Sequence, residues 1–550
     1  MTWIRALVVF GLLVSLPGSQ RLSGAQPGGA PKLLVIVVVD QMRYDYIERM
    51  RPRWTSGMKR LVTEGAVFEQ NFYPYLNTVT CAGHATIGTG SFPSTHGIIM
   101  NAWWRGTRNA SCTEDATVRS VAYEPNGEAV GHSATQLLVP TMGDRLREKS
   151  PASRVVTLSM KPRSAVMLAG HRGVVSWLDD RDVWATSTAY AEAPNPTVQA
   201  FITANPRERL RQEVWSRLHG PDAYTGKDDA PGEAPPRGWT PVFPHPLAGA
   251  PGTPPSMFLS LWERSPFADT FLASMAESLI KGMKLGQGDA VDYLGVSFAT
   301  LDYVGHNFGP DSHEVQDTLM RLDLSMGALL NALDSYVGRG RYVLGLSADH
   351  GVAPVPEARQ LAGEAGGRLV MQRLQEAANQ ALADTLGPGQ PVVRAEYTQL
   401  FLSETAQQKA LENPRLLDPA IAALERMPGV DRVLRGAGLE RQRASTDPVV
   451  RAAALSHVPG RSGQIVVVPQ RYFVIGAATA TGTTHGTQHP YDQQVPLIFF
   501  GAHVKPGRYQ TPSTPADLAP TIAATVGLQL PGADGVVQSG AFATMQSGRR

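Results

Sequence analysis

An uninterrupted run of apolar, mostly β-branched residues near the N-terminus, Leu33–Val39, limits the possible folds more than any other feature of the chain. A run without alternating polar residues is typical of a strand buried on both faces, as in a parallel sheet covered by helices. The run stops at Asp40. Because open α/β sheets bind ligands outside the carboxyl ends of their strands, Asp40 lies where a functional site is expected.

The same pattern returns along the chain. Further buried strands are predicted at residues 154–160, 293–301, 342–348 and 495–500, and the second and third of these are followed by Asp302 and Asp349. Helical periodicity is found at residues 44–62, 267–286, 313–336 and 517–528. Strands that alternate with helices predict an α/β fold with a doubly wound, mostly parallel central sheet and helices on both faces.

Two regions interrupt this alternation. Residues 221–255 are rich in Pro, Gly and short polar residues and predict an irregular surface insertion. Residues 369–475 mix helical and strand patterns and predict a small subdomain inserted between core strands. The 550 residues, 43% of them hydrophobic, can bury one large core, so we expect a single catalytic domain over residues 26–550.

The first 25 residues have the organisation of a signal peptide. Arg5 precedes the apolar stretch Ala6–Leu16, and Ser23-Gly24-Ala25 offers a small-residue cleavage site. The apolar stretch is short for a membrane span, although an uncleaved anchor is the alternative. Since no later segment resembles a membrane helix, we expect an exported protein, periplasmic or secreted, with no membrane span after signal removal.

Composition excludes several classes of protein. The net charge of +2, with charges interspersed, gives no sign of nucleic-acid binding, and none is expected. Cys81 and Cys112 are the only cysteines, which excludes a disulfide scaffold and a cysteine-ligated zinc site. In an oxidising compartment these two residues could pair, but the sequence does not determine whether they do. We expect a monomer.

Acidic residues and histidines gather at the predicted strand ends. His306 and His350 follow two of these ends closely, and His485 lies before the last predicted strand. If the strands are neighbours, three carboxylates and three imidazoles meet at one edge, where buried carboxylates need cations. Nitrogen and oxygen ligands without thiolates suit zinc, and two groups of three suit two zinc ions. Each residue alone could be a cap or a loop residue, and His489 competes with His485.

Thr80 lies in a turn, Asn77–His84, that is followed by small residues and predicts the start of a helix. A hydroxyl there is close to free backbone N–H groups and to the positive end of the helix dipole, which suits a nucleophile that attacks an anion. The alternative is an ordinary helix-capping threonine.

Two cations flank a proline in Lys161-Pro162-Arg163, which predicts a stiff loop after a strand. The two cations would project from this loop. The alternative is a solvated surface pair.

These residues lie in motifs that resemble the alkaline phosphatase superfamily. Within it the chain is similar to the secreted, phosphate-irrepressible (PafA-type) alkaline phosphatases with a threonine nucleophile. The matching motifs are Val38–Arg43, Thr78–His84, Asn101–Trp103, Lys161–Arg163, Asp302–His306, Ala348–Gly351 and His485-Gly486. Trp104-Arg105 departs from the Tyr-Asp of many relatives. A sulfatase-like role for Cys81 is rejected, because the Pro and Arg of the modification signal are missing.

The resemblance implies two zinc ions per chain, one held by Asp302, His306 and His485. It implies that the other is held by Asp40, Asp349, His350 and the oxygen of Thr80. Asn101, Lys161 and Arg163 would contact the phosphoryl oxygens. Thr80 would attack phosphorus, and hydrolysis of the resulting phosphothreonine would release phosphate from small-molecule phosphate monoesters. A phosphodiesterase or nucleotide pyrophosphatase on the same two-zinc frame, and a non-catalytic exported binding protein, are the alternatives.

Overall fold

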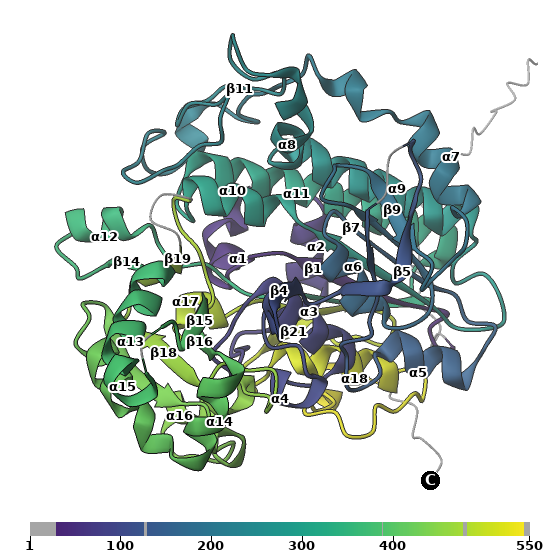
Figure 1. Ribbon diagram of the computed structural model, residues 1–550. Helices are drawn as coiled ribbons and strands as arrows, with labels where there is room; N and C mark the ends of the chain where they lie inside the picture. The colour runs from purple at the N-terminus through teal and green to yellow at the C-terminus, as the bar shows by residue number, and fades with distance from the viewer. Residues whose placement is uncertain (1–28, 126–128, 388, 477–480, 544–550) are drawn as a thin grey trace, which may run out of the picture.

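The computed structural model describes residues 29–125, 129–387, 389–476 and 481–543, so the predicted signal peptide lies outside the described residues. Its centre is an eleven-stranded sheet in the order β21-β2-β20-β13-β1-β12-β7-β8-β9-β5-β6 (Figure 1). The strands are β1 (Leu33–Val39), β2 (Ala66–Phe68), β5 (Glu114–Ala122), β6 (Val130–His132), β7 (Val155–Ser159), β8 (Val174–Leu178), β9 (Trp184–Ser187), β12 (Asp292–Phe298), β13 (Tyr342–Ser347), β20 (Leu497–Gly501) and β21 (Gly507–Tyr509).

The middle of the sheet is parallel and the flanks are mainly antiparallel. β1 lies between β12 and β13, and β7 and β8 continue the parallel part beyond β12. β20 and β9 pair antiparallel with the two ends of this part. The predicted doubly wound α/β fold is confirmed, with a mixed sheet whose parallel strands are the central ones.

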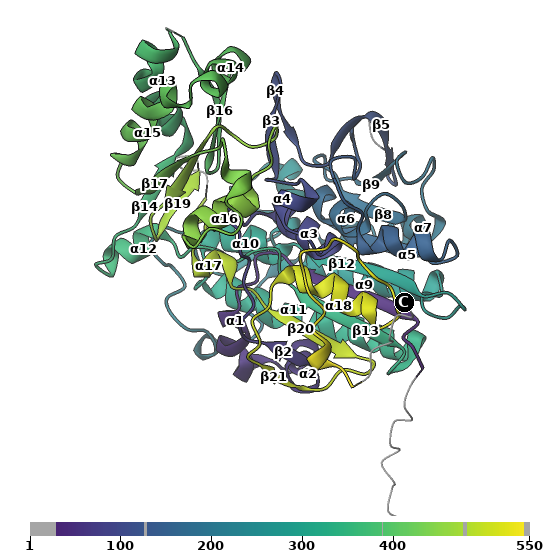
Figure 2. The same cartoon turned by 90° about the horizontal axis from the view of Figure 1, so that it is seen from below.

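Helices cover both faces because β1 is apolar on both. The odd-numbered residues of β1, from Leu33 to Val39, pack with one group of helices. The even-numbered residues, from Leu34 to Val38, pack with the other group. The first group comprises α2 (Gly57–Glu64), α7 (Pro196–Ala204), α8 (Phe258–Glu263), α9 (Pro266–Gly282) and α11 (His313–Ala332). The second comprises α3 (Thr80–Thr89), α5 (Met142–Lys149), α6 (Pro162–Ala169) and α18 (Leu518–Ala524). Figure 2 shows α18 and α3 on one side of the sheet.

Three local predictions need correction. The predicted helix 44–62 is split into α1 (Asp45–Arg49), a 3-10 turn at Arg51–Arg53 and α2, since Pro52 has no N–H to continue the helix. Strand β12 ends at Phe298, so Asp302 lies in the first turn of α10 (Thr300–Phe308). Pro162 occupies the first position of α6, where a fixed φ favours a helix, so the predicted stiff loop is a helix start.

The two interrupting regions differ in regularity. Residues 221–255 contain the 3-10 turn Pro221–Ala223 and the short strand β11 (His245–Pro246), and the segment binds α10 through Ala234 and Asn307. A second sheet in the order β15-β16-β18-β17 lies beside the core in green (Figure 1). It comprises β15 (Val392–Glu396), β16 (Gln399–Leu402), β17 (Val430–Arg435) and β18 (Ile465–Pro469), with helices α13 (Met371–Leu386), α14 (Glu404–Glu412), α15 (Asp418–Glu425) and α16 (Pro448–Ser456). The division into domains stays a prediction.

Among the described residues, no helix is long and apolar enough to cross a membrane.

Candidate active site

The parallel register brings the strand ends together. Val39 of β1 pairs with Phe298 of β12, and Val38 pairs with Ser347 of β13, so the three strands end at nearly one level. Asp40 follows the middle strand and is flanked by the segments that carry Asp302 and Asp349. The three carboxylates therefore converge, as the sequence pattern predicts, and all three residues are buried.

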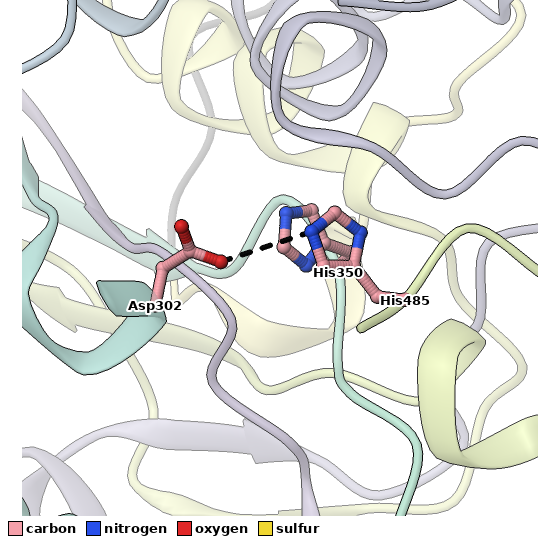
Figure 3. A group of neighbouring side chains, drawn as sticks. All are labelled: Asp302, His350 and His485. Atoms are coloured by element: carbon pink, nitrogen blue, oxygen red, sulfur yellow. Dashed lines mark ion pairs between the residues drawn. The ribbon is translucent and has the colours of Figure 1, made fainter. Parts of the chain in front are cut away.

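Two groups of buried side chains form at this edge. In each group one ligand atom per residue lies within 4.8 Å of the others. One group is Asp40, Asp349 and His350. The other is Asp302, His350 and His485, which Figure 3 shows. The rings of His350 and His485 stack with centroids 3.4 Å apart. His306, which the sequence assigned to the second group, lies beside it, with its Nε2 3.2 Å from Asp302 Oδ1.

The three imidazoles are held in the same way. His306 Nδ1 is 2.9 Å from the carbonyl of Thr483, and His485 Nδ1 is 2.8 Å from that of Thr78. His350 Nδ1 is 2.9 Å from the carbonyl of Gly351. A ring that donates Nδ1–H to a carbonyl leaves Nε2 unprotonated, which is how proteins orient histidines toward metals.

Two carboxylate oxygens lack hydrogen-bond partners within the described part of the chain. Asp40 Oδ1 and Asp349 Oδ2 are buried, and neither accepts a hydrogen bond, although His350 Nε2 lies 3.4 Å from each and His84 Nδ1 lies 3.2 Å from Asp349 Oδ2. An unsatisfied buried carboxylate oxygen is unfavourable, and a bound cation would remove the penalty. The donor set therefore fits metal binding by nitrogen and oxygen ligands.

Electrostatics in the site follow from burial and crowding. Burial, followed by the charges of Asp302 and Asp349, raises the pKa of Asp40 well above its usual range. Burial, followed by neighbouring His350 and His306, holds the pKa of His485 well below its usual range. Neutral imidazoles are the form that binds metals, and metal binding is coupled to carboxylate deprotonation.

Thr80 is the first residue of α3, and Val79 occupies the capping position. The alternative of a capping threonine is not observed, because no side chain caps this helix. Instead, Thr80 Oγ1 lies 3.4 Å from His350 Nε2. The hydroxyl thus faces the group formed by Asp40, Asp349 and His350, at the amino end of a helix.

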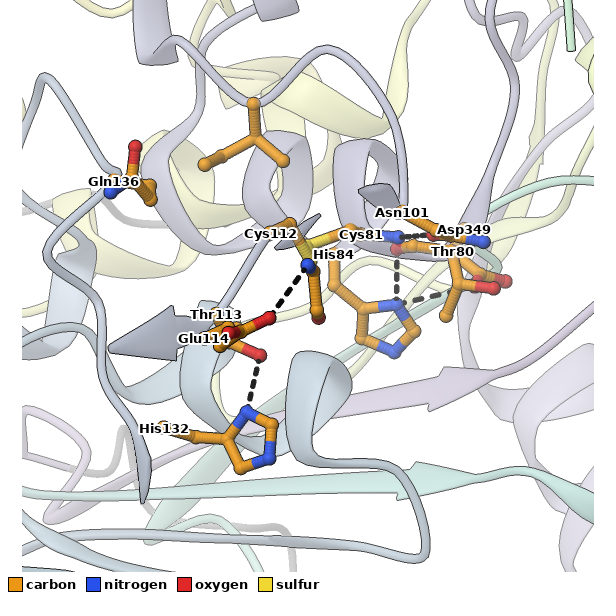
Figure 4. Close-up of a disulfide and its surroundings, with 12 residues drawn as sticks. Thr80, Cys81, His84, Asn101, Cys112, Thr113, Glu114, His132, Gln136 and Asp349 are labelled. Carbon is orange, nitrogen blue, oxygen red and sulfur yellow. Dashed lines mark hydrogen bonds and ion pairs between the residues drawn. A yellow bond between two sulfur atoms is a disulfide. The ribbon is translucent and has the colours of Figure 1, made fainter. Parts of the chain in front are cut away.

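Asn101 is fixed beside Thr80 by a disulfide that joins Cys81 and Cys112 (Figure 4). Its Oδ1 accepts a hydrogen bond of 2.8 Å from the Cys81 N–H, and its backbone carbonyl accepts one of 2.9 Å from the Cys112 N–H. The side-chain NH2 of Asn101 remains the group that can donate to a ligand. Cys81 is fully buried, and its pairing with Cys112 answers the question that the sequence left open.

Lys161 and Arg163 lie at the start of α6. Lys161 is buried, and its Nζ contacts Asp40 Oδ2 at 2.6 Å and Asp302 Oδ2 at 2.5 Å. The family resemblance implied that Lys161 contacts the phosphoryl oxygens of a substrate. In this structure its ammonium group pairs with the two carboxylates instead. Arg163 is half-buried, and among the described residues it has neither a hydrogen bond nor an ion pair.

Sequence reasoning assigned no role to two residues that support the site. Gln41 Nε2 donates to Asp302 Oδ1 at 2.6 Å, and its backbone N–H donates to Asp349 Oδ1 at 3.1 Å. The φ of Gln41 is 68°, a conformation that is unusual outside glycine. His84 Nδ1 lies 2.8 Å from the Thr80 carbonyl and 3.2 Å from Asp349 Oδ2. Gln41 lies in the motif Val38–Arg43 and His84 in the motif Thr78–His84, so the family resemblance was the sequence feature that could have identified them.

His489, the competitor for His485, lies elsewhere. Its Nε2 is 3.1 Å from the carbonyl of Pro469 in the inserted region. His489 also precedes α17 (Pro490–Gln493), and its backbone carbonyl accepts hydrogen bonds from the N–H groups of Asp492 and Gln493. It belongs to neither candidate metal group.

Comparisons with known proteins identify the family of the chain. A family model described as "Type I phosphodiesterase / nucleotide pyrophosphatase" matches residues 34–492. Alkaline phosphatase PafA of Elizabethkingia meningoseptica is 33% identical over 96% of this chain and 95% of its own. Alkaline phosphatase PhoV of Synechococcus elongatus is 32% identical over 91% of each chain.

Solved structures give the same result. The crystal structure of wild-type PafA matches with a TM-score of 0.85 at 30% sequence identity, covering 94% of this chain and all of PafA. Murine ectonucleotide pyrophosphatase/phosphodiesterase 5, at 11% identity and a TM-score of 0.53, shares the fold alone. The chain therefore belongs to the type I phosphodiesterase/nucleotide pyrophosphatase family and, within it, is an enzyme of the PafA-like alkaline phosphatase group.

Proposed function

We propose that the protein hydrolyses phosphate monoesters to an alcohol and inorganic phosphate through a phosphothreonine formed on Thr80. The observation that carries this proposal is a set of three donors: the amide of Asn101, whose oxygen binds the N–H of the residue after Thr80, the buried ammonium of Lys161 beside Asp40, and the guanidinium of Arg163 two residues further along the start of α6, which has no partner among the described residues. A half-buried arginine without a partner is suited to bind an anion.

Two zinc ions are the proposed cofactors. Asp40, Asp349 and His350, with the Thr80 hydroxyl, would hold one, and Asp302, His306 and His485 would hold the other. When bound, the zinc pair supplies Lewis-acid chemistry, which lowers the pKa of a hydroxyl and stabilises charge on a leaving oxygen. The assignment of His350 to the first ion and His306 to the second follows the family resemblance, while the stacked His350 and His485 rings put His350 near both.

The reaction proceeds in two displacements at phosphorus. Thr80 Oγ1, having lost its proton to solvent, forms a bond to phosphorus while the bond to the leaving oxygen breaks, and that oxygen takes up a proton from solvent and departs as the alcohol. Water then attacks the phosphothreonine, the bond to Oγ1 breaks, and phosphate leaves. A helix N-terminus next to Thr80 favours the negative charge that gathers there in both steps.

The cations determine the substrate class. A monoester dianion carries one more charged oxygen than a diester, and Arg163 can bind two oxygens with its planar fork. Lys161 is paired with Asp40 and Asp302 in this structure, and its charge would serve the phosphoryl group once cations compensate those carboxylates. In a diester one of these oxygens carries a second organic group and no charge, so the two cations would be less well matched.

Paired kinetics test this proposal. We expect zinc-loaded enzyme to prefer phenyl phosphate over methyl phenyl phosphate by several orders of magnitude, and a Lys161→Ala, Arg163→Ala double variant to lose most of this preference. The control is Arg145→Ala with Lys149→Ala, which removes two cations from the surface of α5. A better diester substrate, or an unchanged preference in the first variant, would reject the assigned roles.

A second candidate is phosphodiester or nucleotide pyrophosphate hydrolysis at the same site. The description of the matching family model favours it. The same two substrates distinguish the candidates, because a diesterase would turn over methyl phenyl phosphate faster than phenyl phosphate.

We further propose that the enzyme acts outside the cytoplasm, where it would release phosphate from organic esters. The disulfide between Cys81 and Cys112 is typical of oxidising compartments and supports the predicted export signal. Cell fractionation tests this, and a protein confined to the cytoplasm would contradict it.

A further inference from the structure

The inserted subdomain reaches the candidate active site through one tight turn. Tyr397 and Thr398 connect β15 to β16, and Tyr397 has a φ of 45°. A bulky residue rarely adopts this left-handed conformation, which persists only where the surroundings hold it. The backbone N–H of Tyr397 donates to Met371 Sδ at 3.2 Å, one of the contacts that fix the turn.

Both neighbours of Tyr397 are tied to the loops of the active site. Thr398 Oγ1 donates to Asn77 Oδ1 at 2.6 Å, and Asn77 begins the turn that leads to Thr80. On the other side, Glu396 Oε2 accepts a hydrogen bond of 3.2 Å from Asn109 Nδ2 in β4 (Arg108–Ser111), which pairs with the strand that follows Asn101. The turn is therefore held against the segment that leads to the nucleophile Thr80 and against the hairpin that follows Asn101.

The Tyr397 ring packs over Gly486, the residue after His485. A Cβ added to Gly486 would lie 3.2 Å from Tyr397 Cδ1 and 3.4 Å from Val79 Cγ1. The Tyr397 ring and Val79, the neighbour of the nucleophile, thus both pack against the residue that follows a proposed metal ligand. Burial raises the pKa of the Tyr397 hydroxyl to about 12, and the Arg163 and Lys161 charges act on this hydroxyl in the opposite direction.

We infer that Tyr397 is a specificity-determining residue whose ring forms a wall on the leaving-group side and favours monoesters with an aromatic leaving group. The inference rests on the proposed function: Thr80 is assigned to one metal ion, so the other ion, held by Asp302, His306 and His485, would serve the leaving oxygen. An aromatic leaving group can stack on such a ring or meet it edge to face, which a small alkyl group cannot do.

Two substrates and three variants test the wall. We measure kcat/KM for phenyl phosphate and for trifluoroethyl phosphate in wild type, Tyr397→Leu, Tyr397→Phe and the control Tyr472→Leu. Tyr472 is a matched residue, since it is also half-buried, lies in the inserted region and has a positive φ, 65°. We expect Tyr397→Leu to lower the phenyl-to-alkyl ratio about threefold to tenfold, and Tyr397→Phe and Tyr472→Leu to keep it. An unchanged ratio in Tyr397→Leu, or an equal loss in Tyr397→Phe, would overturn the inference.

Inhibitor binding gives a second readout that does not depend on turnover or on the folding of a variant. By calorimetry, wild type should bind phenylphosphonate more tightly than methylphosphonate, and equal affinities would overturn the inference. If wild type hydrolyses neither ester but still prefers phenylphosphonate, the proposed function fails while the aromatic wall stands. If wild type hydrolyses monoesters with no aromatic preference in either assay, only the wall fails.

Discussion

Removal of the disulfide beside Thr80 should lower both stability and activity. Cys81 and Cys112 are separated by 31 residues, and the bond between them closes the loop that contains Asn101. In the chain-entropy model a loop of this length restricts the unfolded chain by about 12 cal/mol/K, or roughly 3.7 kcal/mol at 25 °C. The unfolding entropy of a chain of this size, at about 2.1 cal/mol/K per residue, is roughly 1.2 kcal/mol/K. Dividing the lost free energy by this entropy gives a fall in Tm of about 3 °C.

The perturbation is the pair Cys81→Ala and Cys112→Ala. Alanine is preferred to serine because both positions are fully buried, and a hydroxyl there would need a new partner. Thermal unfolding of wild type and variant, both fully loaded with zinc, measures the difference. Variants are used rather than thiol reductants, because thiols also bind zinc.

Activity should fall as well, because the disulfide connects the two backbone segments that bind Asn101. At a temperature where the variant is fully folded, its lower stability alone would leave kcat unchanged. We therefore expect a lower kcat for a monoester, which reports the displacement of Asn101. A variant that unfolds at the wild-type temperature would refute the entropy argument. A variant with lower Tm but wild-type kcat would show that the disulfide stabilises the loop without positioning Asn101.

Three further predictions concern the site and its surroundings. Thr80→Ala should abolish turnover, and wild type quenched in acid during turnover should carry phosphate on Thr80 by peptide mass spectrometry; label on another residue would reject the nucleophile. Gln41→Leu, which removes the side-chain hydrogen bond to Asp302, should weaken zinc binding about 10- to 100-fold in chelator competition, and unchanged affinity would remove its supporting role. Burial, followed by the charges of Glu233 and Asp228, raises the pKa of Glu314 to about 9. Because the folded state binds this proton more tightly than the unfolded state, stability falls as pH rises from about 4.5 toward 9. Glu314→Gln should therefore unfold at a higher temperature than wild type at pH 9 but not at pH 5, and parallel Tm profiles would contradict this.

Local patterns in the sequence were sufficient for the framework. The apolar run Leu33–Val39 predicted a strand buried on both faces, because burial on two sides excludes polar residues from every position. Asp40 and Asp349 were predicted to lie at the site because each follows an apolar run that predicts a buried strand. Parallel strands end at a common edge of the sheet, so the position of these two residues needs no knowledge of distant contacts. The enzyme class followed from motifs in the right order, and the comparisons confirmed it.

Boundaries near the site were less certain from local patterns. Asp302 was predicted at a strand end, yet it lies in the first turn of α10, since apolar residues that end a buried strand also suit a buried helix start. Lys161-Pro162-Arg163 was predicted as a loop, although proline is equally suited to the first position of a helix.

Tertiary structure alone decided which residues meet across long stretches of chain. The hydrogen bond from Gln41 to Asp302, the packing of Tyr397 on Gly486 and the pairing of Cys81 with Cys112 join segments whose local sequences carry no mark of their partners. Hydrophobic periodicity reports whether a residue is buried, because burial depends on its own strand or helix. Which residue lies opposite depends on the summed packing of the whole sheet and its insertions, and that information exists only in the folded chain.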